Sequence, residues 1–543
     1  MSNFPVRDMG SAGVIADVSP YNLPTNVVSS GVNVRFENGN ISRSPVLRRI
    51  YEFGDDGIKP AYAFSIPAVA NGGNEAIVVV RFDYHAIYSV VGDTVTDLTP
   101  SPIPENSGLG SWTNTFLGNV AYLNNRSDLP YMKRPSDSTF QTLTAWDDEW
   151  RTESLRAYKD FLIALNVTKG ATSYPTMVKW SDIAAFGGPP PSWDETSTTN
   201  SAGENIINEM QTPIIDGLSL RDSFIIYGAS EVWLMNYIGG NLLFQFRKLF
   251  DATGIISQNC VTEVEGLHYV FGSNDIYVND GASKRSIAHG RVKDFIFDNL
   301  VRDQVDKAFV AHNPSLNEIL FCYPSSDAQC SFTDTTIGCN RAAVYNYRRD
   351  LWSFVDLPNL VSACEATVSG GQTYDSLDPT PYTQLGGSYA SDEDDQDAHV
   401  VFVGQVNPGQ GISGNRVYGY DLAYGGRLNR PVETELLRPA FIERVGIDID
   451  EEGIPLTAYK VIQAFYPQIG VTGQGTVDFQ FGASDILGQE PTWGPRITYD
   501  PSVDNRVDNR ESGRYLAYRM YHQGTTDFAF SGLDAKVTER GRR

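Results

Sequence analysis

The sequence predicts an all-β protein, and three observations lead to this. The 543 residues include 28 Tyr, 27 Phe and 49 Gly, a composition that favours strands and turns over long helices. Short runs of β-branched and aromatic residues alternate with turns of Gly, Asn, Asp and Ser. These hairpins recur roughly every 45 residues, as in architectures that repeat one antiparallel sheet around a ring. We therefore expect a β-propeller of about six or seven blades.

The clearest hairpins lie in the middle of the chain. Each pairs two apolar strands across a turn or loop, and no single repeat can bury both faces of its own sheet. The predicted strand pairs are 223–227 with 232–235, 267–271 with 276–278, and 318–323 with 342–347.

Weaker repeats and two flanking regions complete the expected organisation. The arm at residues 1–55 is punctuated by prolines and ends in a hairpin at 31–45, and we expect it to lie against the body or a neighbouring subunit. The propeller is assigned to 56–432, and a small antiparallel sandwich or a set of ring-closing strands to 433–543. Further blade candidates are 61–100, 112–146, 155–180 and 399–420, and a short helix is expected near 294–307.

The charge balance restricts the partners that the chain can bind. The formal net charge is -24, from 66 acidic and 42 basic residues. Stable binding of nucleic acid or of an anionic membrane requires a basic surface, whereas DNA can pass an acidic wall without adhering to it. No apolar run of about 18 residues and no apolar signal core is present. We expect synthesis in a cytoplasm and no membrane anchor.

No pattern in the sequence indicates catalysis, a cofactor or a metal. The five cysteines (260, 322, 330, 339 and 364) lack the close spacing of zinc ligands, and the six histidines form no paired ligand spacing. Nucleophile-elbow, P-loop and dinucleotide motifs are missing. An acidic run lacks the spacing of a calcium loop, so it is either a solvated loop or a loop in a channel lumen or at a tip. Its members are Asp392, Glu393, Asp394, Asp395 and Asp397.

Several segments resemble the tail nozzle proteins (tail tube proteins of the B type) of short-tailed bacteriophages. They occur in the same order along almost the whole chain, although each one alone is ordinary strand and turn sequence. They are Leu-Pro-Thr-Asn at 23–26, Gly-Val-Asn-Val-Arg-Phe-Glu-Asn-Gly-Asn-Ile-Ser-Arg at 31–43, Val-Lys-Trp-Ser-Asp at 178–182, Asn-Glu-Ile-Leu-Phe-Cys-Tyr-Pro-Ser at 317–325, Arg-Ala-Ala-Val-Tyr-Asn-Tyr-Arg-Arg-Asp-Leu-Trp-Ser-Phe at 341–354, and Phe-Ser-Gly-Leu-Asp-Ala-Lys-Val at 530–537.

The resemblance implies a structural virion protein at the distal end of a short tail. Six copies would form a channel that retains the genome and then conducts duplex DNA during ejection, next to a head-to-tail adaptor protein and to tail fibres or spikes. It implies no catalytic residues. Two alternatives stay open: a virion-borne or exported propeller that binds or cleaves polysaccharide, and a propeller scaffold of the host cell.

Overall fold

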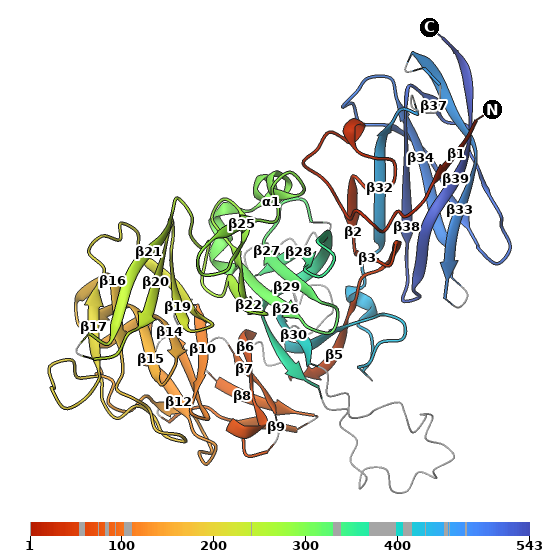
Figure 1. The fold of residues 1–543 in the computed structure, drawn as a ribbon. Helices are drawn as coiled ribbons and strands as arrows, with labels where there is room; N and C mark the ends of the chain where they lie inside the picture. Colours follow the sequence, from red (N-terminus) through yellow and green to blue (C-terminus); the bar gives the residue numbers. More distant parts are fainter. Residues whose placement is uncertain are drawn as a thin grey trace, which may run out of the picture.

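The structure is a computed structural model of the chain. It describes residues 2–53, 60–73, 75–81, 86–92, 94–101, 111–240, 242–328, 338–368, 398–405, 415–428, 430–449, 454–455, 457–472 and 475–542. The fold is all-β, with a propeller body and a β-sandwich body side by side (Figure 1). Both ends of the chain lie in the sandwich.

Five separate four-stranded antiparallel sheets follow one another along the chain and form the blades. The first blade is β6 (Pro60–Ile66), β7 (Ala76–Arg81), β8 (Ala86–Val91) and β9 (Thr94–Asp97), and the second is β10 (Trp112–Leu117), β11 (Val120–Asn125), β12 (Tyr131–Lys133) and β13 (Gln141–Thr142). The third is β14 (Trp150–Tyr158), β15 (Phe161–Lys169), β16 (Thr172–Trp180) and β17 (Gly203–Ile206). The fourth is β18 (Ile214–Leu220), β19 (Ser223–Gly228), β20 (Glu231–Tyr237) and β21 (Phe244–Asp251), and the fifth is β22 (Val261–Val264), β23 (Leu267–Phe271), β24 (Ile276–Asn279) and β25 (Lys284–Ser286).

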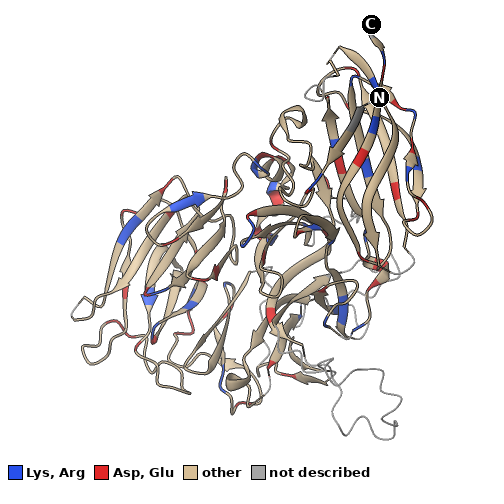
Figure 2. Cartoon of the chain, turned by 45° about the vertical axis from the view of Figure 1, so that its right-hand side comes forward, with Lys and Arg blue, Asp and Glu red and all other residues tan. Residues whose placement is uncertain are grey.

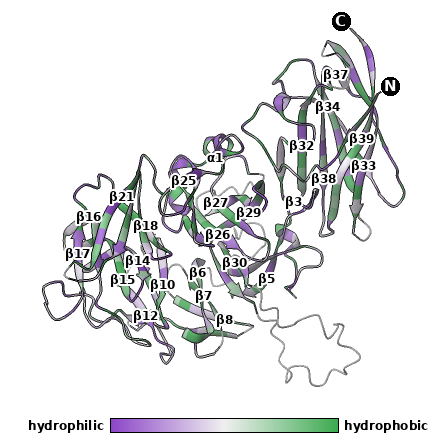
Figure 3. Cartoon of the chain, viewed as in Figure 1, coloured by the Kyte–Doolittle hydropathy of each residue, from purple (hydrophilic) through white to green (hydrophobic). Residues whose placement is uncertain are grey.

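Burial on both faces explains why the blade strands are apolar along their whole length. Successive side chains of a strand point to opposite faces of the sheet. In β19, Phe224 and Ile226 enter the core shared with the third blade, while Ile225 and Tyr227 enter the core shared with the fifth. The hydrophobic residues that fill such strands are visible in Figure 3. Each blade is therefore stable only between its neighbours.

The prediction of six or seven blades is wrong in number. The last two predicted repeats are not separate blades, because the 17-residue strand β29 (Leu351–Thr367) belongs to both. It pairs with β28 up to Leu360 and with β30 from Leu360 onward, so these strands join one 12-stranded sheet. The spacing of hairpins in a sequence does not reveal a strand that two hairpins share. The strands of this part are β26 (Phe309–Asn313), β27 (Glu318–Tyr323), β28 (Cys339–Asn346), β30 (Ala398–Gln405), β31 (Asn415–Asp421) and β5 (Val46–Glu52).

This part of the 12-stranded sheet closes the propeller body against the first blade. Side chains of β5, β29, β30 and β31 share a hydrophobic core with β6, β7 and β8. The N-terminal region supplies β5 as the outer partner of β31. Helix α1 (Lys293–Asn299) and a 3-10 helix (Arg302–Lys307) follow the fifth blade, within the range where a helix was predicted.

The sandwich contains C-terminal and N-terminal strands together. One layer is formed by β1 (Ser2–Val6), β3 (Val34–Glu37), β4 (Asn40–Arg43), β33 (Ala458–Val471), β36 (Val507–Asp508), β37 (Ser512–Gly513) and β39 (Phe528–Arg542). The other is the end of the 12-stranded sheet, with β2 (Ser30–Val32), β32 (Ala440–Ile447), β38 (Tyr515–His522), β34 (Val477–Ser484) and β35 (Thr492–Tyr499). Aromatic rings, among them Phe465, Phe479 and Tyr518, pack between the layers. The division at residues 55 and 432 stays a prediction, although β1 to β4 are structurally part of the sandwich.

Candidate functional site: a buried ion pair between blades and a fixed junction

The acidic residues predicted to line a lumen or tip, Asp392, Glu393, Asp394, Asp395 and Asp397, lie outside the described residues. Elsewhere, acidic and basic residues are interspersed over both bodies (Figure 2). Two other parts of the molecule can carry function: the first strands of the propeller blades, and the junction that joins the two bodies.

A buried ion pair crosses the first strands of the third and fourth blades. Arg156 on β14 donates from Nε and Nη2 to the two carboxylate oxygens of Asp216 on β18, at 2.9 and 2.6 Å. Asp216 is fully buried, and it also accepts from the Ser154 hydroxyl at 2.6 Å and from the Asn259 backbone N–H at 3.0 Å. A paired guanidinium and carboxylate with these additional donors is a satisfied network.

The same network extends to the neighbouring blades. Arg156 donates to the backbone oxygen of Asn114 on β10 at 3.0 Å and to Oδ1 of Asn259 at 2.9 Å. The Tyr62 hydroxyl on β6 donates to Oδ1 of Asn114 at 2.8 Å. Side chains from the first strands of four blades, with Asn259 just before the fifth, are therefore linked to one another. They tie these blades together through buried polar contacts.

Electrostatics keep the central pair charged. Burial opposes ionisation of Asp216, but the adjacent Arg156 and the donated hydrogen bonds hold the pKa of that carboxyl below its usual value. Burial likewise disfavours the charged form of Arg156, yet Asp216 raises the pKa of the guanidinium. The pair is therefore a fixed structural unit, in which the guanidinium of Arg156 and the carboxylate of Asp216 already bind each other.

Sequence reasoning did not identify these residues. Arg156 and Asp216 are 60 positions apart, and each looks like an ordinary charge between apolar neighbours. Position gave little help: Arg156 lies at the very start of the blade candidate 155–180, and Asp216 precedes the predicted hairpin that begins at residue 223.

The junction between the bodies is built on strand β2. Its residues pair with β32 on one side, and Val32 forms a parallel bridge with Phe354 of β29 on the other. One continuous sheet therefore runs from the propeller body into the sandwich. Relative rotation of the two bodies would break hydrogen bonds of this sheet.

Asn33, directly after β2, holds the junction through both its backbone and its side chain. Its backbone N–H donates to the Phe354 carbonyl at 2.7 Å, and its carbonyl accepts from the Ser44 N–H at 3.1 Å. Its side-chain Nδ2 donates to the Pro439 carbonyl at 3.0 Å, and its Oδ1 accepts from the Asp356 N–H at 2.9 Å. The residue has a φ of 58°, a left-handed conformation that Asn tolerates better than most residues.

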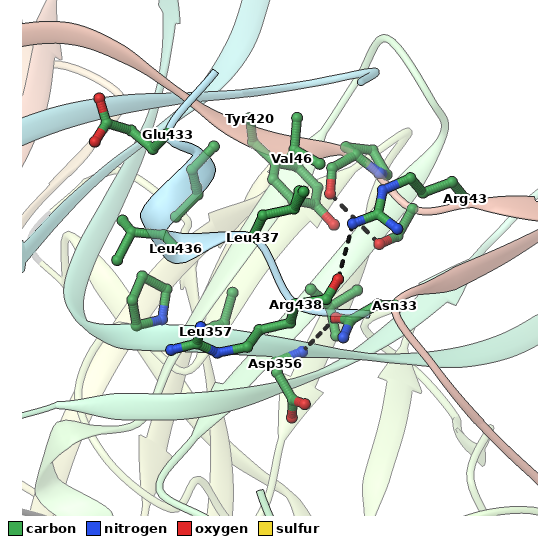
Figure 4. A pocket seen from close by; sticks show the side chains of 15 residues that line it. Asn33, Arg43, Val46, Asp356, Leu357, Tyr420, Glu433, Leu436, Leu437 and Arg438 are labelled. Carbon is green, nitrogen blue, oxygen red and sulfur yellow. Dashed lines mark hydrogen bonds between the residues drawn. The ribbon is translucent and has the colours of Figure 1, made fainter. Parts of the chain in front are cut away.

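A small cavity beside Asn33 shows how closely the segments meet (Figure 4). Its volume is about 30 Å³, which holds only one or two water molecules. Arg43 reaches across it and donates to the Arg438 carbonyl at 2.8 Å. The space is too small for a substrate and serves as packing between the crossing chain segments.

Buried charges also lie at this junction. Nε of Arg341 is 3.0 Å from the Asp356 carboxylate, and both side chains are almost fully buried. Arg35 on β3 lies 3.7 Å from Glu318 on β27. Burial raises the pKa of Glu318 to about 7, against the opposing effect of Arg35. Burial also raises the pKa of Asp356, against the opposing effect of Arg341.

The residues that could hold a metal do not gather. Among the described residues, no group of three or more His, Cys, Asp and Glu side chains is placed to hold an ion. Burial raises the pKa of the Cys260, Cys322 and Cys339 thiols, which disfavours the thiolate needed for coordination. His268 is buried against Tyr227 and the Ser219 carbonyl. In the part of the chain that the structure covers, no helix has the length and apolar character to span a bilayer.

Comparisons with known proteins add little to this geometry. No protein-family model matches the chain, and no curated protein matches it. Among solved structures, the crystal structure of the computationally designed Ika8 protein is similar over 69% of this chain and 99% of its own, with 9% sequence identity and a TM-score of 0.35. Fold and site define the class of the protein: a five-bladed propeller whose blades are joined by a buried charged network, fixed to a sandwich.

Proposed function

We propose that the chain is a structural virion protein that forms the distal nozzle of a short bacteriophage tail. Six copies form a ring whose channel retains the genome and then conducts duplex DNA during ejection. The ring contacts the head-to-tail adaptor protein on one side and tail fibres or spikes on the other. The protein is made in the host cytoplasm and assembles into the virion.

The observation that carries the proposal is the buried Arg156–Asp216 network, which joins neighbouring blades. The polar atoms of Arg156 and Asp216 are satisfied by one another and by adjacent blades, so the pair serves structure and does not present a binding site. The ordered segments that resemble nozzle proteins support the same proposal.

Rigidity and charge also support it. Strand β2 is hydrogen-bonded to both bodies, so the two bodies are expected to move as one unit in a ring. Each copy carries a formal charge of -24. An acidic lumen gives phosphates no cations to bind, and so adds no affinity that would oppose DNA movement.

The deciding experiment is an electron cryo-microscopy map of the purified oligomer or of the virion. We expect a closed sixfold ring with a channel wider than duplex DNA and an acidic wall. A ring without a through-channel, or a basic lumen, would contradict the proposal. A glycan array with a reducing-sugar assay tests the polysaccharide alternative, and clear turnover would replace the structural proposal.

The acidic run is the proposed contribution of side chains to the lumen or tip. Replacing its acids by Lys is expected to leave assembly intact and to slow DNA ejection, because phosphates then gain partners in the channel. Ejection kinetics from otherwise identical particles measure this. Unchanged kinetics would mean that the run lies away from the DNA path.

A further inference from the structure

A second cavity lies where the N-terminal arm, helix α1 and both bodies meet. Its volume is about 150 Å³, against about 30 Å³ for the cavity beside Asn33. A cavity of that size accommodates a benzene ring. It is therefore large enough for a small molecule, which the cavity beside Asn33 is not.

Most of the cavity wall is apolar and built on regular structure. Val32 of β2 is paired with Phe354 of β29 on one side and with Phe441 of β32 on the other. Phe295 on α1 has its ring 5.0 Å from that of Phe354. The apolar lining consists of Val14, Val32, Phe295, Phe354 and Phe441. Because strands and a helix hold these side chains, the space for an apolar ring is formed before any ligand arrives.

Two charged residues, Arg341 and Asp327, line the same cavity. The Arg341 side chain is only 2% exposed, whereas that of Asp327 is 29% exposed. Nη2 of Arg341 donates to the Asp327 carbonyl at 3.2 Å. Among the described residues, Arg341 uses only Nη2 for hydrogen bonds, so Nη1 can donate to a ligand. An apolar cavity with a few convergent polar groups has the composition of a small-molecule site.

The charges around Arg341 favour a neutral ligand. Its Nε lies 3.0 Å from the Asp356 carboxylate, and its Nη2 lies 3.5 Å from the Asp327 carboxylate. A carboxylate ligand would compete with these two acids, and an ammonium ligand would lie beside a guanidinium. An unpaired charge is costly to bury. A carboxamide avoids this cost, because it offers an acceptor to Arg341 and a donor to Asp327 without a net charge.

We propose that this cavity binds a small neutral molecule made of one aromatic ring and a carboxamide. The ring packs against Phe295, Phe354 and Phe441. The carboxamide oxygen accepts from Arg341, and the carboxamide NH₂ donates to Asp327. Asp327, the more exposed of the two charged residues, marks the side from which the ligand enters. The site goes beyond the nozzle function and requires no ring of six copies.

The first test is a ligand-observed NMR titration of the full chain at neutral pH, from roughly 0.1 to 10 mM ligand. The probes are benzamide, benzoate and benzylamine, which are similar in size but neutral, anionic and cationic. We expect benzamide to bind with a Kd of about 1 mM, as a molecule of this size can. The two charged probes should bind at least about tenfold more weakly. No binding of benzamide, or equal binding of the three probes, overturns the proposal.

A cavity-filling variant locates the binding. Ala16 lines the cavity, so Ala16→Leu reduces the space for the ring. We expect benzamide to bind at least about tenfold more weakly to this variant. The matched control is Ala171→Leu, at an exposed position in the β15–β16 turn, which should bind as the wild type does. Unchanged binding by Ala16→Leu, or an equal loss in the control, overturns the proposal.

A second variant tests the polar end and does not depend on how Ala16→Leu folds. Asp327→Asn keeps an acceptor for the Ser325 hydroxyl but removes the carboxylate that repels an anionic ligand. The affinity for benzoate relative to benzamide should therefore rise at least about tenfold. An unchanged ratio overturns the proposal and leaves the nozzle proposal intact, because DNA ejection does not involve this cavity.

Discussion

Replacing Asp216 by Ala should destabilise the propeller strongly. The substitution leaves the Arg156 guanidinium, which is 9% exposed, buried without its carboxylate. Removing one partner of a buried ion pair costs about 3–5 kcal/mol. The Ser154 hydroxyl and the Asn259 N–H also lose their acceptor, and each unpaired buried group adds about 1–3 kcal/mol. We expect a loss of at least about 4 kcal/mol in the free energy of unfolding.

A double-mutant cycle with Arg156→Met identifies the cause. Met is apolar and of similar length, so the double variant removes both charges and should recover about 2 kcal/mol or more relative to Asp216→Ala alone. Urea is the suitable denaturant, because guanidinium salts screen ion pairs. Tryptophan fluorescence reports on the propeller, since seven of the eight tryptophans lie between residues 112 and 352.

The pH dependence gives an independent check of the same pair. Because the folded pKa of Asp216 is lowered, its stabilisation is present above the unfolded pKa and is lost as pH falls through the folded pKa. Asp216→Ala should remove that acid-side loss. Two results would refute a buried, mutually satisfied pair. One is a loss of less than about 1 kcal/mol in the free energy of unfolding for Asp216→Ala, and the other is a double variant that is no more stable than Asp216→Ala alone.

Three substitutions test the junction, and one deletion tests the arm. Replacing Asn33 by Ala should lower the free energy of unfolding, measured in urea, by about 2–4 kcal/mol, because two side-chain hydrogen bonds are lost and the φ is strained for Ala. Replacing Asn33 by Gly should lower it less, because Gly tolerates that φ. Equal losses in the two variants would exclude a contribution from strain. Because the folded pKa of Glu318 is about 7, wild-type stability should fall by about 3 kcal/mol as pH rises from about 4.5 to above 7; Glu318→Gln should flatten that slope, and an unchanged slope would assign it to another group. Deleting residues 2–24 removes five buried apolar side chains: Phe4, Val6, Met9, Val14 and Leu23. Their burial contributes about 8–15 kcal/mol of hydrophobic stabilisation, so limited proteolysis of the truncated chain should find the sandwich unfolded. A protease-resistant truncated chain would show that the arm is dispensable.

The sequence predicted the elements of the fold better than the relations between them. The hairpins at 223–235 and 267–278 are blade strands because continuous apolar runs reflect burial on both faces. The predicted number of blades is wrong because of β29, since no local signal shows that one long strand is shared by two hairpins. The Arg156–Asp216 pair was missed for the same reason: its partners come together only when blades close around the axis.

The placement of the N-terminal arm was only partly predictable. Its prolines and polar residues indicated an extended strap, and the structure places it on the chain's own sandwich, where Ser2 pairs with Val537. Pairing over such a separation has no local sequence signal.

The pairing of β1 with β39 has a consequence for synthesis. At about 5–20 residues per second, a ribosome needs roughly half a minute or longer to translate the 535 positions between Ser2 and Val537. The five blades can form meanwhile, because each pairs only strands that are close in sequence. Strand β1 must therefore wait, unpaired, until β39 has been translated. We therefore expect chaperones that hold nascent chains to increase the yield of correctly folded sandwich far more than that of the propeller. The position chosen for an affinity tag should likewise affect the folding of the sandwich more than that of the propeller.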